Sequence, residues 1–158
     1  ARRMIGAMRL ALGADHAGYH LKQELAAKLA QQGHQILDLG THSTAPVDYP
    51  DSAEAVARIL REGQADRGII VCGSGAGVSI AASKFPGIRA AVCHDTYSAH
   101  QAVEHDDMNV LCIGSRGVGP SLALELAQTF IGATFSGEDR HLRRLHKIFD
   151  IEGRFAAR

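Results

Sequence analysis

The sequence has few cysteines, no excess of charge of either sign and no long hydrophobic run. Its three cysteines, Cys72, Cys93 and Cys112, are odd in number and lack paired spacing. This pattern argues against a disulfide framework and for a reducing compartment, so we expect a cytoplasmic protein. Lysine plus arginine and aspartate plus glutamate number 17 each, which argues against binding to nucleic acid or a membrane surface through net charge.

The apolar runs are short, and the longest, such as GIIVCG and NVLCIG, are far below the length that spans a bilayer. No secretory signal precedes the first expected strand. A chain of 158 residues that is 46% hydrophobic can bury one core. We therefore expect one domain at residues 8–150, with Met8 as a candidate natural start and with flexible ends at residues 1–7 and 151–158.

Short apolar runs alternate with helical patterns along the chain. We predict strands at MRLALGAD, HQILDLG, RGIIVCG, GIRAAVCH and MNVLCIGS, with helices between them. Nearly continuous apolar runs are typical of parallel strands that are covered on both faces. The sequence therefore predicts an α/β protein, a single-domain three-layer α/β/α sandwich around a five-stranded parallel, Rossmann-like sheet.

Local signals set the expected limits of the helices. A helix is expected at residues 19–32, closed by a glycine. Pro50 predicts a loop before the next helix, with Asp51 or Ser52 as its cap. The later helices are expected to begin near residue 76 and to occupy residues 98–104, 120–130 and 139–149.

Polar side chains follow each predicted strand. Because the carboxyl ends of parallel strands share one rim, where ligands bind in such sheets, we expect these side chains to converge. In chain order they are Asp15 and His16, Asp48 and Tyr49, Cys72 with Gly73–Gly77, His94 and Asp95, and Ser115 and Arg116.

The loop Gly73–Gly77, with the sequence GSGAG, joins the third strand to a helix. Its glycines let backbone N–H groups turn toward one point, which suits a phosphate or an oxygen that gains charge in a reaction. A tight turn alone would also require glycines. Cys72 directly precedes the loop, and a helix N-terminus favours a thiolate. A thiolate there could remove a proton from a carbon beside a carbonyl and leave an enediolate.

Two further clusters lie outside this loop. His100 and His105 are five residues apart, which is poor spacing for a shared metal on a helix. We expect His105 and Asp106 in the turn that enters the fifth strand. Arg140 and Arg144 are four residues apart on one helical face and could hold a phosphate, although a solvated basic face has the same pattern.

Together these segments resemble the ribose-5-phosphate isomerase B family, which also contains galactose-6-phosphate and allose-6-phosphate isomerases. The resemblance covers residues 8 to about 149. It is carried by GADHAGYHLK, DLGTHS, VDYPD, GIIVCGSGAGVSIAASKFPGIRAAVC, YSA, HDDMNVLCIGSR and RHLRR. It implies an isomerase that interconverts D-ribose 5-phosphate and D-ribulose 5-phosphate, in the pentose phosphate pathway, through an enediolate and without metal or cofactor. The alternative substrate is a 6-phosphohexose of the allose or galactose type.

The resemblance also implies roles for single residues. Cys72 matches the general base, and His105 matches the acid that opens the sugar ring. The family forms dimers or tetramers whose active site draws on two chains, so we expect His105 to serve the Cys72 of a neighbouring chain. The C-terminal helix is expected to pack on that chain. Contact with the phosphosugar is implied for Asp15, His16, Tyr49, Gly73, Ser74, Gly75, Ala76, Gly77, Asp106, Arg116, Arg140 and Arg144.

The chain departs from the family pattern at two positions. Ser83 and Asp106 stand where the family often has asparagine. A carboxylate at Asp106 would repel a phosphosugar unless it is paired or turned away. One branch of the family uses a glutamate as the base, and the matching position here is Val78, so the cysteine branch is the one resembled.

Other functions fit parts of the sequence. A dinucleotide-binding module would use Gly73–Gly77 with Asp95 about 20 residues further on, but the loop follows the third strand rather than the first. A non-catalytic sugar-phosphate sensor would need neither Cys72 nor His105. A metal-dependent enzyme could use His94, Asp95 and His105.

Overall fold

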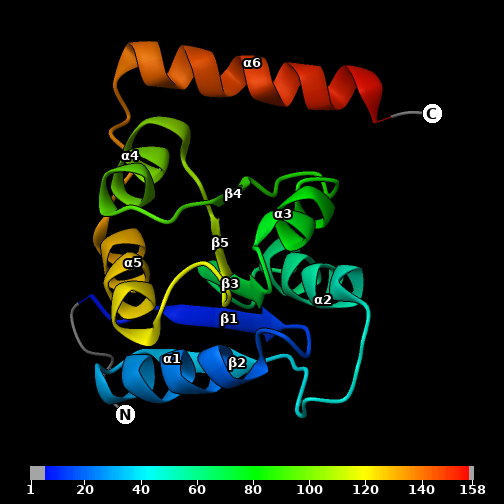
Figure 1. Ribbon diagram of the computed structural model, residues 1–158. Coiled ribbons are helices and arrows are strands. Elements are labelled where there is room, and N and C mark those ends of the chain that lie inside the picture. The colour runs from blue at the N-terminus through cyan, green and yellow to red at the C-terminus, as the bar shows by residue number, and fades with distance from the viewer. Residues whose placement is uncertain (1–5, 157–158) are drawn as a thin grey trace.

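The computed structural model describes residues 6–156, which fold around a five-stranded sheet (Figure 1). Neighbouring strands pair in parallel in the order β2-β1-β3-β5-β4. This arrangement confirms the predicted parallel sheet. The strands are β1 (Arg9–Ala14), β2 (Gln35–Asp38), β3 (Arg67–Cys72), β4 (Ala90–Val92) and β5 (Val110–Gly114).

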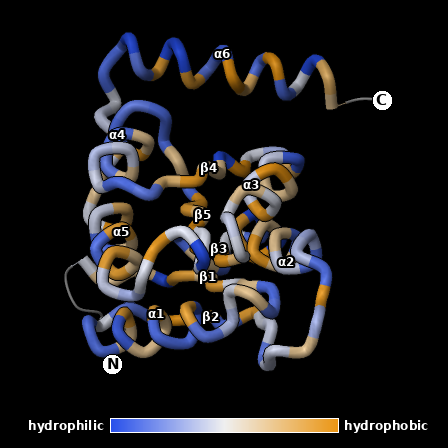
Figure 2. The backbone as a smooth tube through the Cα atoms, viewed as in Figure 1, coloured by the Kyte–Doolittle hydropathy of each residue, from blue (hydrophilic) through white to orange (hydrophobic). Residues whose placement is uncertain are grey.

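Helices cover both faces of the sheet, as the predicted three-layer sandwich requires. One apolar cluster packs α1, α4 and α5 against one face, and a second packs α2 and α3 against the other. Figure 2 shows hydrophobic residues along the strands that lie between these helices. No helix within residues 6–156 is long and apolar enough to cross a membrane. The helices are α1 (Tyr19–Gln31), α2 (Tyr49–Arg61), α3 (Ala76–Ala82), α4 (Thr96–Asp106), α5 (Pro120–Gly132) and α6 (Asp139–Phe155).

The apolar runs form strands because both faces of the sheet are buried. Successive side chains of a strand point to opposite faces. In β3, Ile69 and Val71 join the cluster beneath α1, α4 and α5, whereas Ile70 and Cys72 join the cluster beneath α2 and α3. The strand therefore ends with the Cys72 side chain on the face that α2 and α3 cover.

The start of α2 differs from the prediction. The helix begins at Tyr49, its N-cap is Asp48, and Pro50 lies in its first turn. Proline is tolerated there because the N–H groups of a first helical turn have no intrahelical acceptor. The expected cap at Asp51 or Ser52 is therefore wrong, and Tyr49 is held by a helix rather than by a loop.

Two other helix ends also differ from the prediction. α4 continues to Asp106, so His105 and Asp106 lie in its last turn rather than in a turn that enters β5. α6 continues to Phe155, and its Glu152 accepts hydrogen bonds from the Gly87 N–H at 3.2 Å. The helix thus extends through residues 151–155, six residues beyond its predicted end. Of the two ends that we expected to be flexible, residues 1–5 and 157–158 lie outside the described residues.

Candidate active site

A cavity of about 380 Å³ opens at the carboxyl ends of β1 and β3. β2 and β3 lie on opposite sides of β1, so the direction in which strands are added reverses between β1 and β3. Ligands bind at such a switch point in open α/β sheets. The cavity therefore lies where the fold favours a site. Its lining consists of Asp15, His16, Ala17, Tyr49, Cys72, Gly73, Ser74, Gly77 and Arg116.

Cys72 lines this cavity, with 5% of its surface exposed. The Gly75 N–H donates a hydrogen bond to Cys72 Sγ at 3.1 Å. Gly75 has a φ of 78°, and a Cβ atom there would lie 3.0 Å from the carbonyl carbon of Ile113. Only glycine fits this left-handed, crowded position. The loop can therefore fold back over the sulfur and present an N–H group to it.

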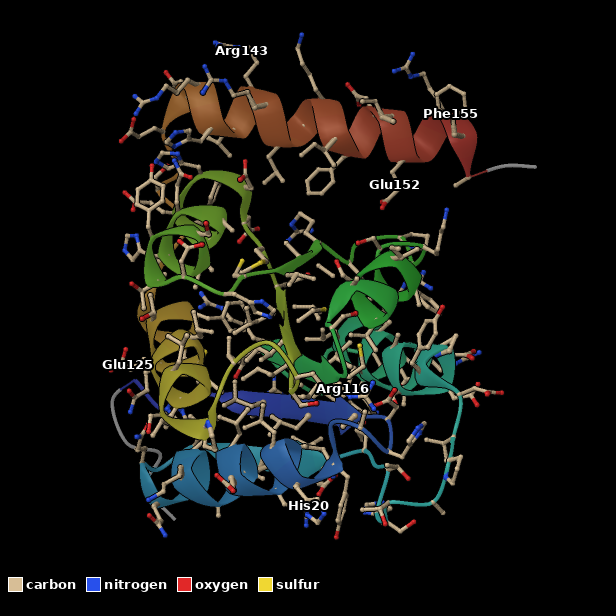
Figure 3. All side chains as sticks on the ribbon, viewed as in Figure 1. His20, Arg116, Glu125, Arg143, Glu152 and Phe155 are labelled. Atoms are coloured by element: carbon tan, nitrogen blue, oxygen red, sulfur yellow. The ribbon has the colours of Figure 1, made fainter. Side chains whose placement is uncertain are left out.

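The glycine loop also brings two functional side chains close to the backbone. A Cβ atom on Gly73 would lie 3.4 Å from Nη1 of Arg116, and one on Gly77 would lie 2.9 Å from the ring of Tyr49. The Arg116 N–H donates to Gly73 O at 3.0 Å, which ties the loop after β5 to the glycine loop. Figure 3 shows Arg116 beside the end of β1. The missing side chains of Gly73 and Gly77 make this approach possible.

The residues that follow β1 are held by backbone contacts. Asp15 Oδ1 accepts a hydrogen bond from the Gly18 N–H at 3.1 Å. His16 Nδ1 accepts one from the Val47 N–H at 3.2 Å, so Nε2 carries the proton in the neutral ring. Asp15 thus offers a carboxylate to the cavity and His16 a ring N–H donor.

Two residues of the predicted loop do not themselves line the cavity. Gly75 is buried beneath it, and Ala76 begins α3. The Ala76 N–H donates to Ser74 Oγ at 3.2 Å, which orients the serine at the cavity edge. Gly73, Ser74 and Gly77 thus line the cavity, whereas Gly75 and Ala76 shape the loop.

His105, Asp106, Arg140 and Arg144 form a second group, away from this cavity. The ring of His105 stacks on that of His141, with centroids 4.0 Å apart and an interplanar angle of 25°. Burial, followed by the electrostatic effects of neighbouring His105 and Arg140, lowers the pKa of His141, although Glu138 opposes the change. These residues therefore gather where the end of α4 meets the start of α6. Within residues 6–156 of one chain, the predicted site is divided in two.

A second, larger cavity of about 610 Å³ lies beneath α6. Asp106 and Ser83 line it, so the two departures from the family pattern lie away from the Cys72 of the same chain. In Figure 3 Glu152 points from α6 toward the rest of the molecule, while Arg143 points away. The side chains of α6 that border this cavity are largely apolar and exposed: Ile148, Phe149, Ile151 and Phe155.

The remaining cysteines differ from Cys72. Cys93 and Cys112 are buried in the two apolar clusters, as expected for small buried hydrophobic residues. Burial and the charge of Asp95 raise the pKa of the Cys93 thiol. Burial is also the main cause that raises the pKa of the Cys112 thiol. Neither thiol has the environment of a base.

The residues of the metal-dependent alternative are separated by α4. Asp95 caps the start of this helix, where its Oδ1 accepts from the Ser98 N–H at 2.7 Å, and His105 lies in its last turn. His94 Nε2 instead accepts from the Gly114 N–H at 3.0 Å. In the part of the chain that the structure describes, no three His, Cys, Asp or Glu residues are grouped to hold a metal ion.

The sequence analysis missed Lys22 and Asp38. Lys22 has no exposed surface and forms an ion pair with Asp38 at 2.5 Å. The sequence contained a signal of this burial. Lys22 precedes Leu25 by three residues and Leu29 by seven, so it shares their buried helical face.

Comparisons with known proteins show the family of this chain. The family model described as Ribose/Galactose Isomerase matches residues 10–148. Ribose-5-phosphate isomerase B of Escherichia coli is 45% identical over 92% of this chain and 97% of its own length. D-erythrulose-4-phosphate isomerase of Pectobacterium atrosepticum is 40% identical over 82% of this chain and 86% of its own. The structure of ribose-5-phosphate isomerase B from Clostridium thermocellum superposes with a TM-score of 0.92 at 47% identity, covering 94% of this chain and 99% of that one.

Proposed function

This chain belongs to the ribose/galactose isomerase family and is a sugar-phosphate isomerase, and from that premise we propose that it interconverts D-ribose 5-phosphate and D-ribulose 5-phosphate. The observation that carries this proposal is the placement of Cys72, the glycine loop and Arg116 around one cavity. That cavity offers a sulfur base, backbone N–H donors and a cation for the phosphate.

Cys72 acts as the general base on the open-chain sugar. The thiolate removes the proton from C2 of the aldose, and negative charge develops on O1 to give an enediolate. N–H groups of the glycine loop stabilise that charge. The thiol then returns its proton to C1, while the proton of the O2 hydroxyl passes to O1 and C2 becomes the carbonyl. The cysteine ends as a thiolate, and the reaction consumes neither metal nor cofactor.

His105 opens the furanose ring by giving a proton to the ring oxygen as its bond to C1 breaks, while the O1 hydroxyl loses its proton to solvent and C1 becomes the aldehyde carbonyl. Its place beside Arg140 and Arg144 puts an acid and two phosphate-binding groups in one cluster, apart from the Cys72 of the same chain. A complete site then requires this cluster from one protomer and the Cys72 cavity from another. The protein therefore acts as a homo-oligomer, a dimer or a pair of dimers.

The surface of α6 supports an oligomer. Ile151 and Phe155 are 52% and 62% exposed, and they border the cavity beneath the helix. A second copy of the chain would cover this apolar surface and bring the His105 cluster to its neighbour. We expect this oligomer to act in the cytoplasm, where free thiols such as Cys72 persist.

The identity of the sugar is tested by a substrate panel. We expect the highest kcat/KM on ribose 5-phosphate, compared with allose 6-phosphate, galactose 6-phosphate and erythrulose 4-phosphate. The last is included because a relative carries that substrate in its name. A higher kcat/KM on either hexose phosphate would assign the protein to the alternative, 6-phosphohexose isomerase. A higher kcat/KM on erythrulose 4-phosphate would reject both assignments.

Replacement of Arg144 by alanine is expected to raise the KM for ribose 5-phosphate by about 10- to 100-fold, because a charge-assisted hydrogen bond to phosphate contributes about 1.5–3 kcal/mol. kcat should change little, since the phosphate is bound in both ground and transition states. Steady-state kinetics measure both constants. Arg143→Ala is the matched control, since Arg143 lies on the same helix and points away from the molecule (Figure 3). An unchanged KM in Arg144→Ala would show that Arg144 does not bind the phosphate and belongs to a solvated basic face.

A further inference from the structure

Lys22 is a fully buried charged residue that none of the steps above uses. It lies on α1, and its Nζ donates to Asp38 Oδ1 at 2.5 Å and to Gln23 Oε1 at 3.1 Å. A buried ammonium group is strongly unfavourable unless it is paired, and Asp38 supplies the opposite charge. An apolar side chain could fill the same space beside Leu25, so the charge itself calls for an explanation.

Asp38 connects this ammonium group to the turn after β2. Its Oδ1 also accepts a hydrogen bond from the Gly40 N–H at 3.0 Å. Partial burial raises the pKa of Asp38, but the hydrogen bonds from Lys22 and Gly40, together with the charge of Lys22, outweigh it and lower the pKa below its ordinary value. The carboxylate is therefore ionised in neutral solution and holds the turn as a charged acceptor.

The turn after β2 is hydrogen-bonded to Ala14, the residue just before Asp15 and His16. The Ala14 N–H donates to Gly40 O at 2.8 Å, and the Thr41 N–H donates to Ala14 O at 2.7 Å. Both backbone groups of Ala14 are thus bound to the turn. Asp15 and His16, the next two residues, line the Cys72 cavity. The Ser52 hydroxyl also donates to Ala14 O at 2.7 Å, and the Asp15 N–H donates to Val71 O at 3.2 Å, so the turn shares the placement of this segment with α2 and β3.

We propose that Lys22 is a positioning residue for the isomerase reaction: paired with Asp38, it anchors the Gly40 turn and so sets the placement of Asp15 and His16 against the substrate. The inference rests on the proposed function, in which these two residues contact the phosphosugar. Lys22 touches no reacting atom and acts through this series of hydrogen bonds. Its removal should weaken substrate binding more than the chemical step.

The test is the kinetics of a Lys22→Met variant, which keeps the length of the side chain and removes its charge. We expect KM to rise about tenfold, with kcat per folded molecule within about threefold of the unchanged protein. Lys28→Met is the matched control, because Lys28 lies on the same helix and is exposed; its KM should not change. A role in stability alone would lower the folded fraction and leave KM unchanged, so an unchanged KM in folded Lys22→Met overturns the proposal.

A double variant covers the case in which Lys22→Met does not fold. Lys22→Met with Asp38→Asn leaves no unpaired charge behind, yet it still lacks the anchor of the turn. The same rise in KM is expected, and an unchanged KM again overturns the proposal. All variants are measured on the phosphosugar that the unchanged protein uses best. A wrong choice of sugar then appears as poor turnover of ribose 5-phosphate by the unchanged protein and is not confused with failure of the role of Lys22.

Discussion

Replacement of Cys72 by alanine is expected to lower kcat on ribose 5-phosphate by about 10³-fold or more, because a positioned general base contributes about 10²–10⁴-fold and alanine has no group to replace it. Alanine removes only the sulfur, which accepts a hydrogen bond from the Gly75 N–H beside the cavity. The groups assigned to the phosphate remain in place. The Kd for ribose 5-phosphate, measured by calorimetry, should therefore stay within a few-fold of the original value.

Cys93→Ala provides the matched control for that variant. Cys93 is also buried and loses the same atom, but it lies in the apolar cluster beneath α1, α4 and α5. Its replacement should leave kcat and KM on ribose 5-phosphate nearly unchanged. A Cys72→Ala variant that retains near-normal kcat would show that another group is the base. A variant that loses both turnover and binding would place the sulfur in binding rather than in proton transfer.

Mixing two inactive variants is expected to restore activity. Cys72→Ala loses the base, and His105→Asn loses the ring-opening acid, so each alone should convert ribose 5-phosphate very slowly. If each site combines Cys72 of one protomer with His105 of its partner, a hybrid dimer has one intact site. Random exchange in an equal mixture makes half of the dimers hybrid and recovers about a quarter of the original activity per protomer.

A second mixture controls for exchange itself. Asp15 and Cys72 line the same cavity of one chain, so a hybrid of Cys72→Ala with Asp15→Asn has no intact site and should be no more active than the two variants measured separately. Native mass spectrometry of both mixtures measures the oligomer and the fraction of hybrids. If hybrids form and the mixture of Cys72→Ala with His105→Asn stays inactive, the shared site is disproved.

Local patterns predicted the secondary structure well where burial decides it. The apolar run from Arg67 to Cys72 became β3 because both faces of the sheet are covered, and the chain turns sharply before α3 because Gly75 adopts a left-handed, crowded position that holds no side chain. The prediction erred at ends of helices. Pro50 was predicted to lie in a loop, yet it occupies the first turn of α2, where its missing N–H removes no intrahelical hydrogen bond. α6 continues to Phe155, since Glu152 ties it to Gly87.

The candidate site was predicted in part. Asp15, Cys72 and Arg116 follow three different strands, and parallel strands bring their carboxyl ends to one rim, so their meeting could be expected. Tyr49 was expected near them, but the contact of its ring with Gly77 depends on how α2 packs beside α3. No sequence pattern specifies such packing between helices.

By itself, the sequence determined the parallel sheet, the cysteine before a glycine loop and the order of polar residues along the rim, because periodicity and loop chemistry act over a few neighbouring residues. Only the tertiary structure decided that His105 stacks on His141, away from the Cys72 of its own chain, and that Lys22 is buried against Asp38. These placements depend on how α4, α6 and α1 are oriented against the sheet. That orientation is a property of packing among distant segments, which no short stretch of the chain encodes.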